Sequence, residues 1–289
     1  MKKFILTILF CLLSIFTFAN DWEFGSKGGH IIPLKGSNMS IKKEKLILKL
    51  TADGMLVNVK FVFDNPKAEN KIIGFVTPEG GNHYGPKSER SPAPLQIKNF
   101  KTFVNGKEVK SNVVPLSELL SQGILDNNVI KEYKQKEEDS YNIHNYVYYF
   151  NTDFKKGKNV VEHSYFYTGA SGLTGEYSFG REFEYILTTI SKWKNQTVED
   201  FEIEFHPGNY PVVLPYTFWN NDKKVDWKII GKGKITSTDP IKPTPENEET
   251  GFCEHGSVFI KLKKGYVRYK TKNFSPDMDF SCGTYRTFK

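Results

Sequence analysis

The stretch MLVNVKFVFDNP, residues 55–66, predicts a β-strand with one buried face. Every second residue from Val57 to Phe63 is apolar, and most of the residues between them are polar. Successive side chains of a strand point to opposite faces, so this period of two gathers the apolar side chains on one side. Pro66 ends the strand, because proline cannot donate the backbone hydrogen bond that a central strand requires. The stretch therefore favours a sheet that packs one face against a core.

Strand-like patterns recur along most of the chain. Before residue 112 they appear in KLILKL and KIIGFVT, and FKTFVNGKEV contains Asn105-Gly106, a strong signal for a two-residue hairpin turn. After residue 140 the strand-like segments are HNYVYYF, NVVEHSYFY, REFEYILTTI, VEDFEIEF, VVLPYTFW, VDWKIIGKGKI, SVFIKL and YVRYK. Turn residues separate them at the spacing of all-β sandwiches or barrels. We therefore expect a mainly β fold with two antiparallel β-sandwich-like domains, residues 20–111 and 141–289.

A helical pattern is confined to residues 112–140, in the segment PLSELLSQGILDNNVIKEYKQKEED. Ser117 can cap a short helix whose Leu119 faces inward, and Asp126 can cap a second helix over residues 127–138. The second helix has only a narrow apolar stripe, so we expect it to lie over a sheet edge. These residues predict a short helical connector between the two domains.

The N-terminal residues MKKFILTILFCLLSIFTFAND have the pattern of a signal peptide. Two lysines precede an apolar run, and Thr17 and Ala19 are the small residues before a cleavage site. The apolar run is shorter than the roughly 20 residues that a membrane span requires. We expect removal of residues 1–19 and export to the periplasm, the cell surface or the medium, with no membrane span in the mature chain.

The charge of the chain is moderately basic. Removal of residues 1–19 lowers the net charge from +7 to +5, because this segment contains two lysines and no acidic residue. Such a charge suits an anionic surface, whereas nucleic-acid binders usually concentrate more charge on one face. We therefore expect no nucleic-acid partner, and an anionic envelope ligand or another envelope protein instead.

Cys253 and Cys282 would remain after cleavage, and an even pair in an oxidising compartment predicts a disulfide. The alternative is a thiol nucleophile at Cys253 with His255 nearby. Side chains of sequence neighbours on an extended chain point apart, which favours the disulfide.

One long loop is expected at residues 78–94, which contain four prolines and three glycines. A loop of this length either binds a ligand or is mobile. Its candidate contact residues are His83, Tyr84, Lys87 and Arg90.

Several stretches together resemble a family of uncharacterised exported bacterial proteins, known as a domain of unknown function. They are GGHIIPL, MSIKKEKLILKL, VNVKFVFDNPKAENKIIGFVTPEG and YILTTISKWKNQTVEDFEIEF. More remotely, Phe63-Asp64-Asn65 and residues 75–81, followed by FKTFVNGKEV, resemble the VIT domain of inter-alpha-trypsin inhibitor heavy chains. The second resemblance implies a β-sandwich with an interaction role. Neither resemblance supplies catalytic residues.

Strand-borne glutamates are the main argument for an enzyme. Glu182 and Glu184 lie two apart on one predicted strand, and Glu202 and Glu204 repeat the arrangement. Residues at this spacing share a face about 6.5–7 Å apart, within the range that glycosidases use. The apolar residues between them are also typical of a half-buried strand whose glutamates face water. A carbohydrate-active enzyme is therefore the alternative to a non-catalytic protein.

Other catalytic and metal motifs are incomplete. GASGLTG has Leu173 where a nucleophile elbow around Ser171 requires glycine. The histidines have no local metal-site spacing, and Asp277 with Asp279 is too sparse for calcium. We predict no catalytic residue, no metal and no cofactor.

A basic surface is predicted near the C-terminus, where Lys264-Gly265 can form a two-residue hairpin turn. The hairpin places Lys261 opposite Arg268, and like charges directly opposite each other are destabilising. An acidic partner is therefore required, either the internal segment 246–249 or an external anion. The candidate anionic-ligand patch comprises Lys261, Lys263, Arg268, Lys270 and Lys272. These features favour an exported, non-catalytic binding or scaffolding protein of the bacterial cell envelope.

Overall fold

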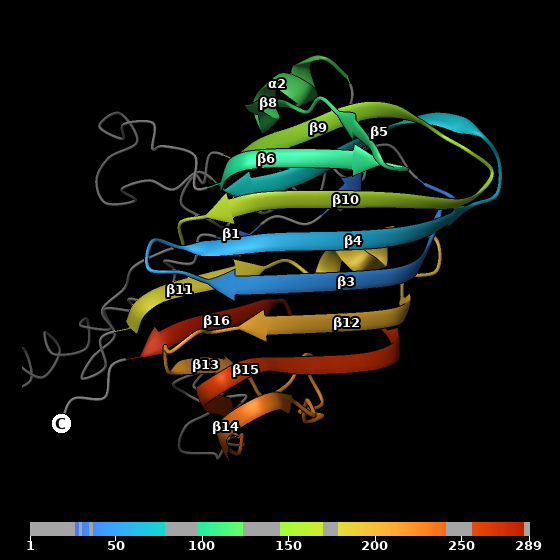
Figure 1. Ribbon diagram of the computed structural model, residues 1–289. Coiled ribbons are helices and arrows are strands. Elements are labelled where there is room, and N and C mark those ends of the chain that lie inside the picture. Colours follow the sequence, from blue (N-terminus) through green and yellow to red (C-terminus); the bar gives the residue numbers. More distant parts are fainter. Residues whose placement is uncertain are drawn as a thin grey trace, which may run out of the picture.

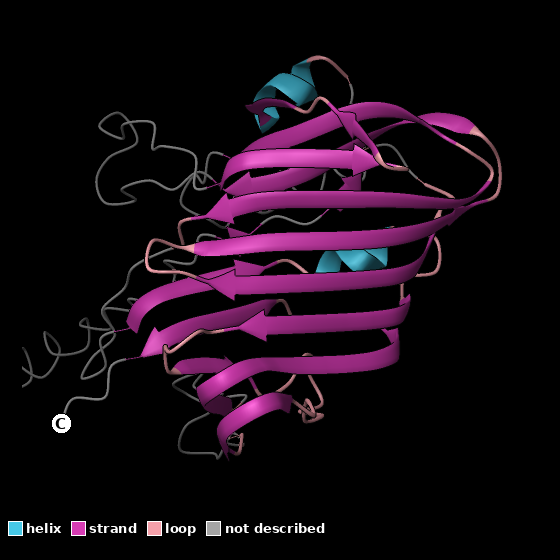
Figure 2. Ribbon diagram, in the orientation of Figure 1, coloured by secondary structure: helices cyan, strands magenta, loops and turns pink. Residues whose placement is uncertain are grey.

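The computed structural model describes residues 27–28, 31–34, 37–78, 97–123, 145–169, 179–240 and 256–285. Within these ranges the regular structure is β-strand, apart from the short helix α2 (Leu116–Ser121) and the 3-10 helix η2 (Thr188–Lys192) (Figure 2). The predicted mainly β class is confirmed. The helices in the described ranges are too short to span a membrane.

The described strands form two sheets. The larger has 12 strands in the order β1-β11-β16-β13-β15-β12-β3-β4-β10-β6-β7, with β14 also paired to β15. Its strands are β1 (Lys27–Gly28), β3 (Ser40–Leu50), β4 (Met55–Asn65), β6 (Ile97–Val104), β7 (Lys107–Val109), β10 (Gly157–Tyr167), β11 (Phe179–Tyr185), β12 (Val198–His206), β13 (Val212–Pro215), β14 (Lys228–Thr238), β15 (Ser257–Phe274) and β16 (Phe280–Tyr285). The smaller sheet has the order β2-β5-β9-β8. Its strands are β2 (Ile31–Pro33), β5 (Glu69–Pro78), β8 (Asn112–Pro115) and β9 (Asn145–Phe154).

β4 behaves as its sequence predicts. Val57, Val59, Phe61 and Phe63 are each at most 2% exposed, and the residues between them are half-buried or exposed. Burying a side chain of this size contributes about 1.5–3 kcal/mol. The two-residue turn at Asn105-Gly106 also forms, between β6 and β7.

Strands from both halves of the chain pair in one sheet. β3 pairs with β4 on one side and runs parallel to β12 on the other, with Leu46 next to Ile203. The buried side chains of both halves belong to one hydrophobic cluster. The predicted arrangement of two sandwich-like domains is therefore not shown. The pairing of two strands this far apart in sequence cannot be predicted from the alternation of apolar and polar residues in either strand.

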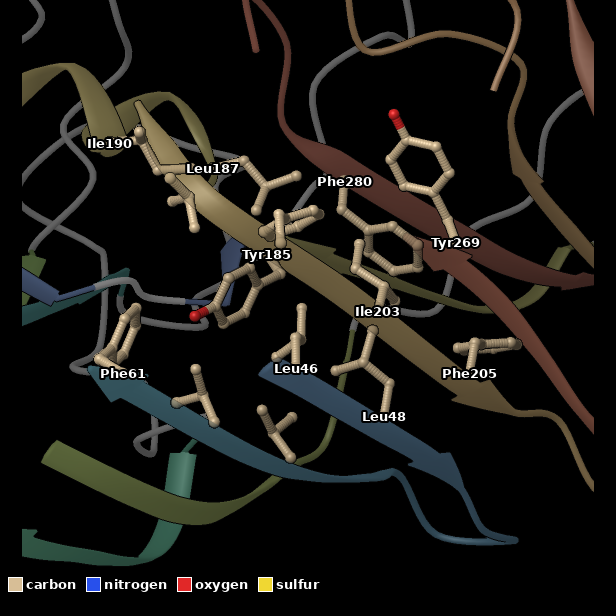
Figure 3. Packing of buried hydrophobic residues seen from close by; sticks show 14 of the residues in the cluster. Leu46, Leu48, Phe61, Tyr185, Leu187, Ile190, Ile203, Phe205, Tyr269 and Phe280 are labelled. Carbon is tan, nitrogen blue, oxygen red and sulfur yellow. The ribbon is translucent and has the colours of Figure 1, made fainter. Parts of the chain in front are cut away.

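The sheets form two layers around this cluster. Figure 1 shows β6, β10, β4, β3, β12 and β15 side by side as a broad layer. Phe75 of β5 packs against Phe100 of β6 with ring centroids 4.9 Å apart. Phe183 of β11 packs edge-to-face against Tyr167 of β10, with ring centroids 5.7 Å apart. The smaller sheet and β11 therefore form the second layer, and Figure 3 shows side chains such as Tyr185, Leu46 and Ile203 between the layers.

A buried polar contact joins the two layers at their centre. The Tyr185 hydroxyl donates to Oε1 of Glu44, which is 1% exposed, across 3.3 Å. Burial and the Glu44 charge raise the pKa of Tyr185, so the phenol stays protonated and can donate. A buried carboxylate is costly without such donors, so this contact favours one alignment of β11 over β3.

The predicted helical connector is not shown. α2 begins at Leu116, before the predicted cap Ser117, and Leu119 is fully buried as expected. α2 contacts β8 and β9, so it lies at an edge of the smaller sheet. The second predicted helix lies outside the described residues.

β11 is shorter than its sequence pattern predicts. It ends at Tyr185, and η2 follows, because Oδ1 of Asp279 accepts hydrogen bonds from the backbone N–H groups of Leu187 and Thr188 at 2.8 and 2.9 Å. The side chain of Ile190 is buried, as part of this 3-10 helix and not of a strand.

The predicted hairpin turn at Lys264-Gly265 is wrong. β15 continues through these residues from Ser257 to Phe274 and pairs with β14 along most of its length. Gly231 and Gly265 face each other across this pair with φ values of +137° and +102°. A Cβ on Gly265 would lie 1.9 Å from the Ile230 carbonyl oxygen. The glycines therefore permit a close backbone approach where a turn was expected.

Beyond this close approach, β15 changes neighbours. Its residues 267–274 pair with β12, and its residues 257–260 pair with β13, which itself pairs with β16. The strand therefore belongs to both layers and connects them at one side of the molecule.

Gly265→Ala is expected to destabilise the protein more than Gly106→Ala. At Gly106, φ is +82° and no other atom would lie within 4 Å of a Cβ, so only the left-handed strain of about 1–2 kcal/mol applies. At Gly265 the β14 backbone must also move, and we expect a loss of about 3 kcal/mol or more. Urea unfolding of both variants measures the difference. Equal losses would contradict the close approach.

Candidate functional site

The outer face of the larger sheet carries an ordered set of charges. On β12 the apolar residues Phe201, Ile203 and Phe205 are fully buried. The residues between them are acidic and half-buried, and β12 lies between β3 and β15, whose outward residues are mostly basic. We call this surface the charge ladder, with Lys42, Lys43, Lys45, Glu199, Asp200, Glu202, Glu204, Lys270 and Lys272 as its members.

Carboxylates of the ladder lie between cations from both neighbouring strands. Asp200 is 2.9 Å from Nζ of Lys43 on β3 and 3.2 Å from Nζ of Lys272 on β15. Glu202 lies 3.3 Å from both Lys45 and Lys270. The charges of β12 are therefore satisfied within the fold.

These contacts shift the ionisation of the ladder. A hydrogen bond from Lys43 holds the pKa of Asp200 below its usual value, and Lys272 adds to this effect. Burial opposes ionisation of Glu202, but hydrogen bonding with Glu204 and Lys270 and the charge of Lys45 outweigh it, so the pKa of Glu202 is also lowered. A glycosidase requires one carboxylic acid with a raised pKa. The lowered pKa of Glu202 does not meet this requirement, and its carboxylate is held by lysines of both neighbouring strands.

Glu182 and Glu184 lie on β11, in the second layer. Phe183 and Tyr185 face the core, as predicted, and the two glutamates are half-buried on the opposite face. Burial raises the pKa of Glu182, which meets one requirement of a general acid.

A shallow surface depression of about 470 Å³ lies at one end of the charge ladder. Its lining residues are Lys42, Lys43, Glu199, Asp200, Lys272 and Asn273. Most of these charges pair with each other, for example Lys42 with Glu199. The depression is therefore already neutralised by internal ion pairs and is a poor site for a charged ligand.

The predicted anionic-ligand patch is divided by the structure. Lys270 and Lys272 belong to the charge ladder, so their acidic partners come from β12. Segment 246–249, proposed as the internal partner, lies outside the described residues. Lys261 lies opposite Lys234 of β14 and Arg268 lies opposite Lys228, so the predicted pairing of Lys261 with Arg268 is wrong.

A different group of lysines gathers where β14 and β15 pair. Lys232 lies opposite Lys264, and Lys234 lies opposite Lys261. We call these four residues the lysine quartet. All four are exposed, and within the described ranges they have no ion pair, which distinguishes them from the lysines of the ladder.

An irregularity in the pairing places the quartet on one face. Between the two lysine pairs β15 has one residue more than β14, and Lys263 is this extra residue. Leu262 remains buried opposite Gly233. Opposite side chains are about 4.5–5.5 Å apart, and the next pair lies about 6.5–7 Å along the strand. Four like charges at these distances favour a bound anion.

Sequence reasoning missed Lys232 and Lys234. They lie in VDWKIIGKGKI, which is a strand from Lys228 onward as predicted, but the sequence pattern did not connect it to the C-terminal lysines. The Lys-Gly-Lys alternation could have indicated them, since residues two apart on a strand share a face and the two lysines therefore form a basic pair.

The predicted disulfide is not supported. Cys282 is a free cysteine, 5% exposed, on the core side of β16, and Cys253 lies outside the described residues. Burial raises the pKa of the Cys282 thiol, and the charges of Glu182 and Glu184 add to this effect. The thiol is therefore protonated and unreactive at neutral pH.

Other predicted motifs have structural roles or lie outside the described ranges. Asp277 accepts a hydrogen bond from the backbone N–H of Asn220, and Asp279 accepts from the backbone N–H groups of Leu187 and Thr188 at the start of η2. Across the described residues, no three His, Cys, Asp or Glu side chains cluster as metal ligands. Ser171 and the contact residues of the 78–94 loop lie outside the described ranges.

Comparisons with known proteins identify the fold but no family. No protein-family model and no curated protein matches the chain. Among solved structures, the chain is similar to a candidate nutrient-binding protein from Legionella pneumophila subsp. pneumophila str. Philadelphia 1, with a TM-score of 0.54 and 16% identity. The match covers 90% of this chain and 70% of the Legionella chain. At this identity the likeness shows a shared fold alone.

Asp200→Asn is expected to lower the free energy of unfolding by about 1 kcal/mol at pH 7, because it leaves Lys43 and Lys272 without their carboxylate. The lowered pKa of Asp200 means that its contribution is fully present above the unfolded value and is lost as the pH falls through the folded value, below about 3.8. The two proteins should therefore converge in acid. Urea unfolding from pH 7 to pH 3 measures this, with the exposed Glu108→Gln as control. A constant difference at all pH values would contradict the ion-pair origin.

Cys282 is expected to resist a maleimide reagent in the native protein and to react in 8 M urea without reductant, because unfolding exposes the thiol and restores its usual pKa. Mass spectrometry locates the label. The matched control is Cys253→Ser, which cannot form the disulfide and should behave identically at Cys282. Resistance in urea that disappears with reductant would instead demonstrate the disulfide.

Proposed function

We propose that the protein is an exported, non-catalytic binding protein of the bacterial cell envelope that holds an anionic ligand at the lysine quartet. One observation carries this proposal: Lys232 faces Lys264 and Lys234 faces Lys261, all exposed and without an acidic partner in the described residues. Like charges directly opposite each other are destabilising, so a protein gains stability when an anion binds between them.

The charge ladder supports this choice of site by contrast. Ladder lysines of the same sheet are held by carboxylates of β12 at 2.7–3.3 Å. An external anion would compete there with an internal partner that is already in place. At the quartet it meets no such competitor among the described residues.

A binding role is also supported by the structural neighbour, which is described as a candidate nutrient-binding protein. Export is proposed from residues 1–19, whose lysines and apolar run have the signal-peptide pattern. The ligand class that the quartet favours is one that carries closely spaced phosphate, sulfate or carboxylate groups.

Replacing all four quartet lysines with glutamine is expected to lower the salt concentration that elutes the protein from dextran sulfate beads by at least half. Exposed charges act over about 10 Å at 0.1 M salt, so the retention should be strongest at low salt. The measurement is a salt gradient on the purified protein, with thermal unfolding to confirm that the variant is folded.

A matched control removes the same charge elsewhere. Lys98, Lys101, Lys107 and Lys110 are exposed on and beside β6 and β7, and their replacement by glutamine changes the net charge equally. If the two variants elute at the same salt concentration, retention follows net charge and the proposed site is wrong.

A further inference from the structure

β14 is an unusually long strand for the edge of a sheet. In the described residues the larger sheet ends at β1 and β7, with 2 and 3 residues, and the smaller ends at β2 and β8, with 3 and 4 residues. β14 has 11 residues, and among the described strands its one partner is β15 (Figure 1). Short edge strands are a common protection against unwanted pairing. Within the part of the chain that the structure describes, the side of β14 away from β15 therefore presents a long row of backbone donors and acceptors.

The two faces of β14 differ in chemistry. Lys232 and Lys234 lie on the outer face, with the rest of the quartet on β15 beside them. Ile229 and Ile235 lie on the other face, where they are only partly buried against the core. An additional strand beside β14 would extend a basic surface on one face and cover apolar side chains on the other.

Lys232 and Lys234 disfavour pairing of β14 with a second copy of this chain and favour pairing with an acidic strand. Two copies of this chain that paired through β14 would bring their lysines together, and like charges directly opposite each other are destabilising. An acidic strand gains from the same lysines. Charge complementarity therefore points away from self-association and toward an acidic protein segment.

We propose that β14 receives an extended segment of a partner protein, added as a further strand, in which acidic residues alternate with apolar ones. The acidic side chains would lie beside Lys232 and Lys234, and the apolar ones would cover Ile229 and Ile235. Backbone hydrogen bonds would supply affinity, and the alternation would supply specificity. This inference rests on the proposed function, because it uses the same lysine quartet.

The probe is a fluorescent synthetic peptide of four Glu-Val repeats, whose binding is measured by anisotropy on the full chain. Two control peptides have four Lys-Val repeats, or the same glutamates and valines grouped in two blocks. Only the alternating acidic peptide is expected to bind. Lys232→Gln with Lys234→Gln should weaken it about three- to tenfold, as expected for two exposed ion pairs.

Proline substitutions test whether the peptide binds as a strand. Thr236 and Ser237 are exposed neighbours on β14, and successive N–H groups of a strand point to opposite edges. One of Thr236→Pro and Ser237→Pro therefore removes a donor toward β15, and the other removes a donor only at the free edge. The edge variant should keep the wild-type melting temperature and weaken binding at least tenfold, while alanine at the same position should not.

Hydrogen exchange gives a second measurement that needs no variant. The bound peptide should slow exchange of the β14 amides, residues 228–238, and leave β7 unchanged. Peptide binding without this protection, or with equal binding by the grouped peptide, would overturn strand addition.

The two proposals fail in different ways. Dextran sulfate retention that depends on the quartet, together with no binding of the alternating peptide, overturns this inference and leaves the proposed function standing. Retention that ignores the quartet overturns the proposed function.

Discussion

The close approach of β14 and β15 at Gly231 and Gly265 is the constraint on which much of the structure depends. A Cβ on either glycine would lie within 2.2 Å of a carbonyl oxygen of the opposite strand. Beyond this point β15 leaves β12 and pairs with β13, so one strand joins the two layers. The bulge next to the glycines also sets the positions of the quartet lysines. Fold closure and the candidate site therefore share one backbone feature.

The lysines of β15 have different environments on the two sides of Gly265. On one side of Gly265, Lys270 and Lys272 face the carboxylates of β12 and stabilise the sheet. On the other side, Lys261 and Lys264 face lysines of β14. The first group forms ion pairs within the fold, and the second is exposed and belongs to the proposed binding site. The proposed ligand site is therefore distinguished by its neighbours and not by its own composition.

Sequence reasoning identifies the faces of strands but not their neighbours. The buried face of β4, the Asn105-Gly106 turn and the opposite faces of Phe183 and Glu184 all follow from local periodicity, and the structure confirms them. The pairing of β3 with β12 depends on a segment about 150 residues away. Lys264-Gly265 has the same local signal in a turn and in a close approach, and the presence of β14 decides between them. The lysine quartet forms only where β14 pairs with β15. The sequence pattern does not reveal this pairing, so Lys232 and Lys234 were missed.

The position of β3 also means that the larger sheet is completed by a pairing between distant parts of the chain. β3 is central in the larger sheet, but one of its two neighbours is β12, and contacts such as Lys42 with Glu199 span 157 residues. Sheets with pairings this distant form slowly, because the loop must close before the contact is gained. Until residue 206 has been synthesised, β3 has no partner on that side. Late closure of this sheet would be compatible with the proposed export, which requires an unfolded nascent chain.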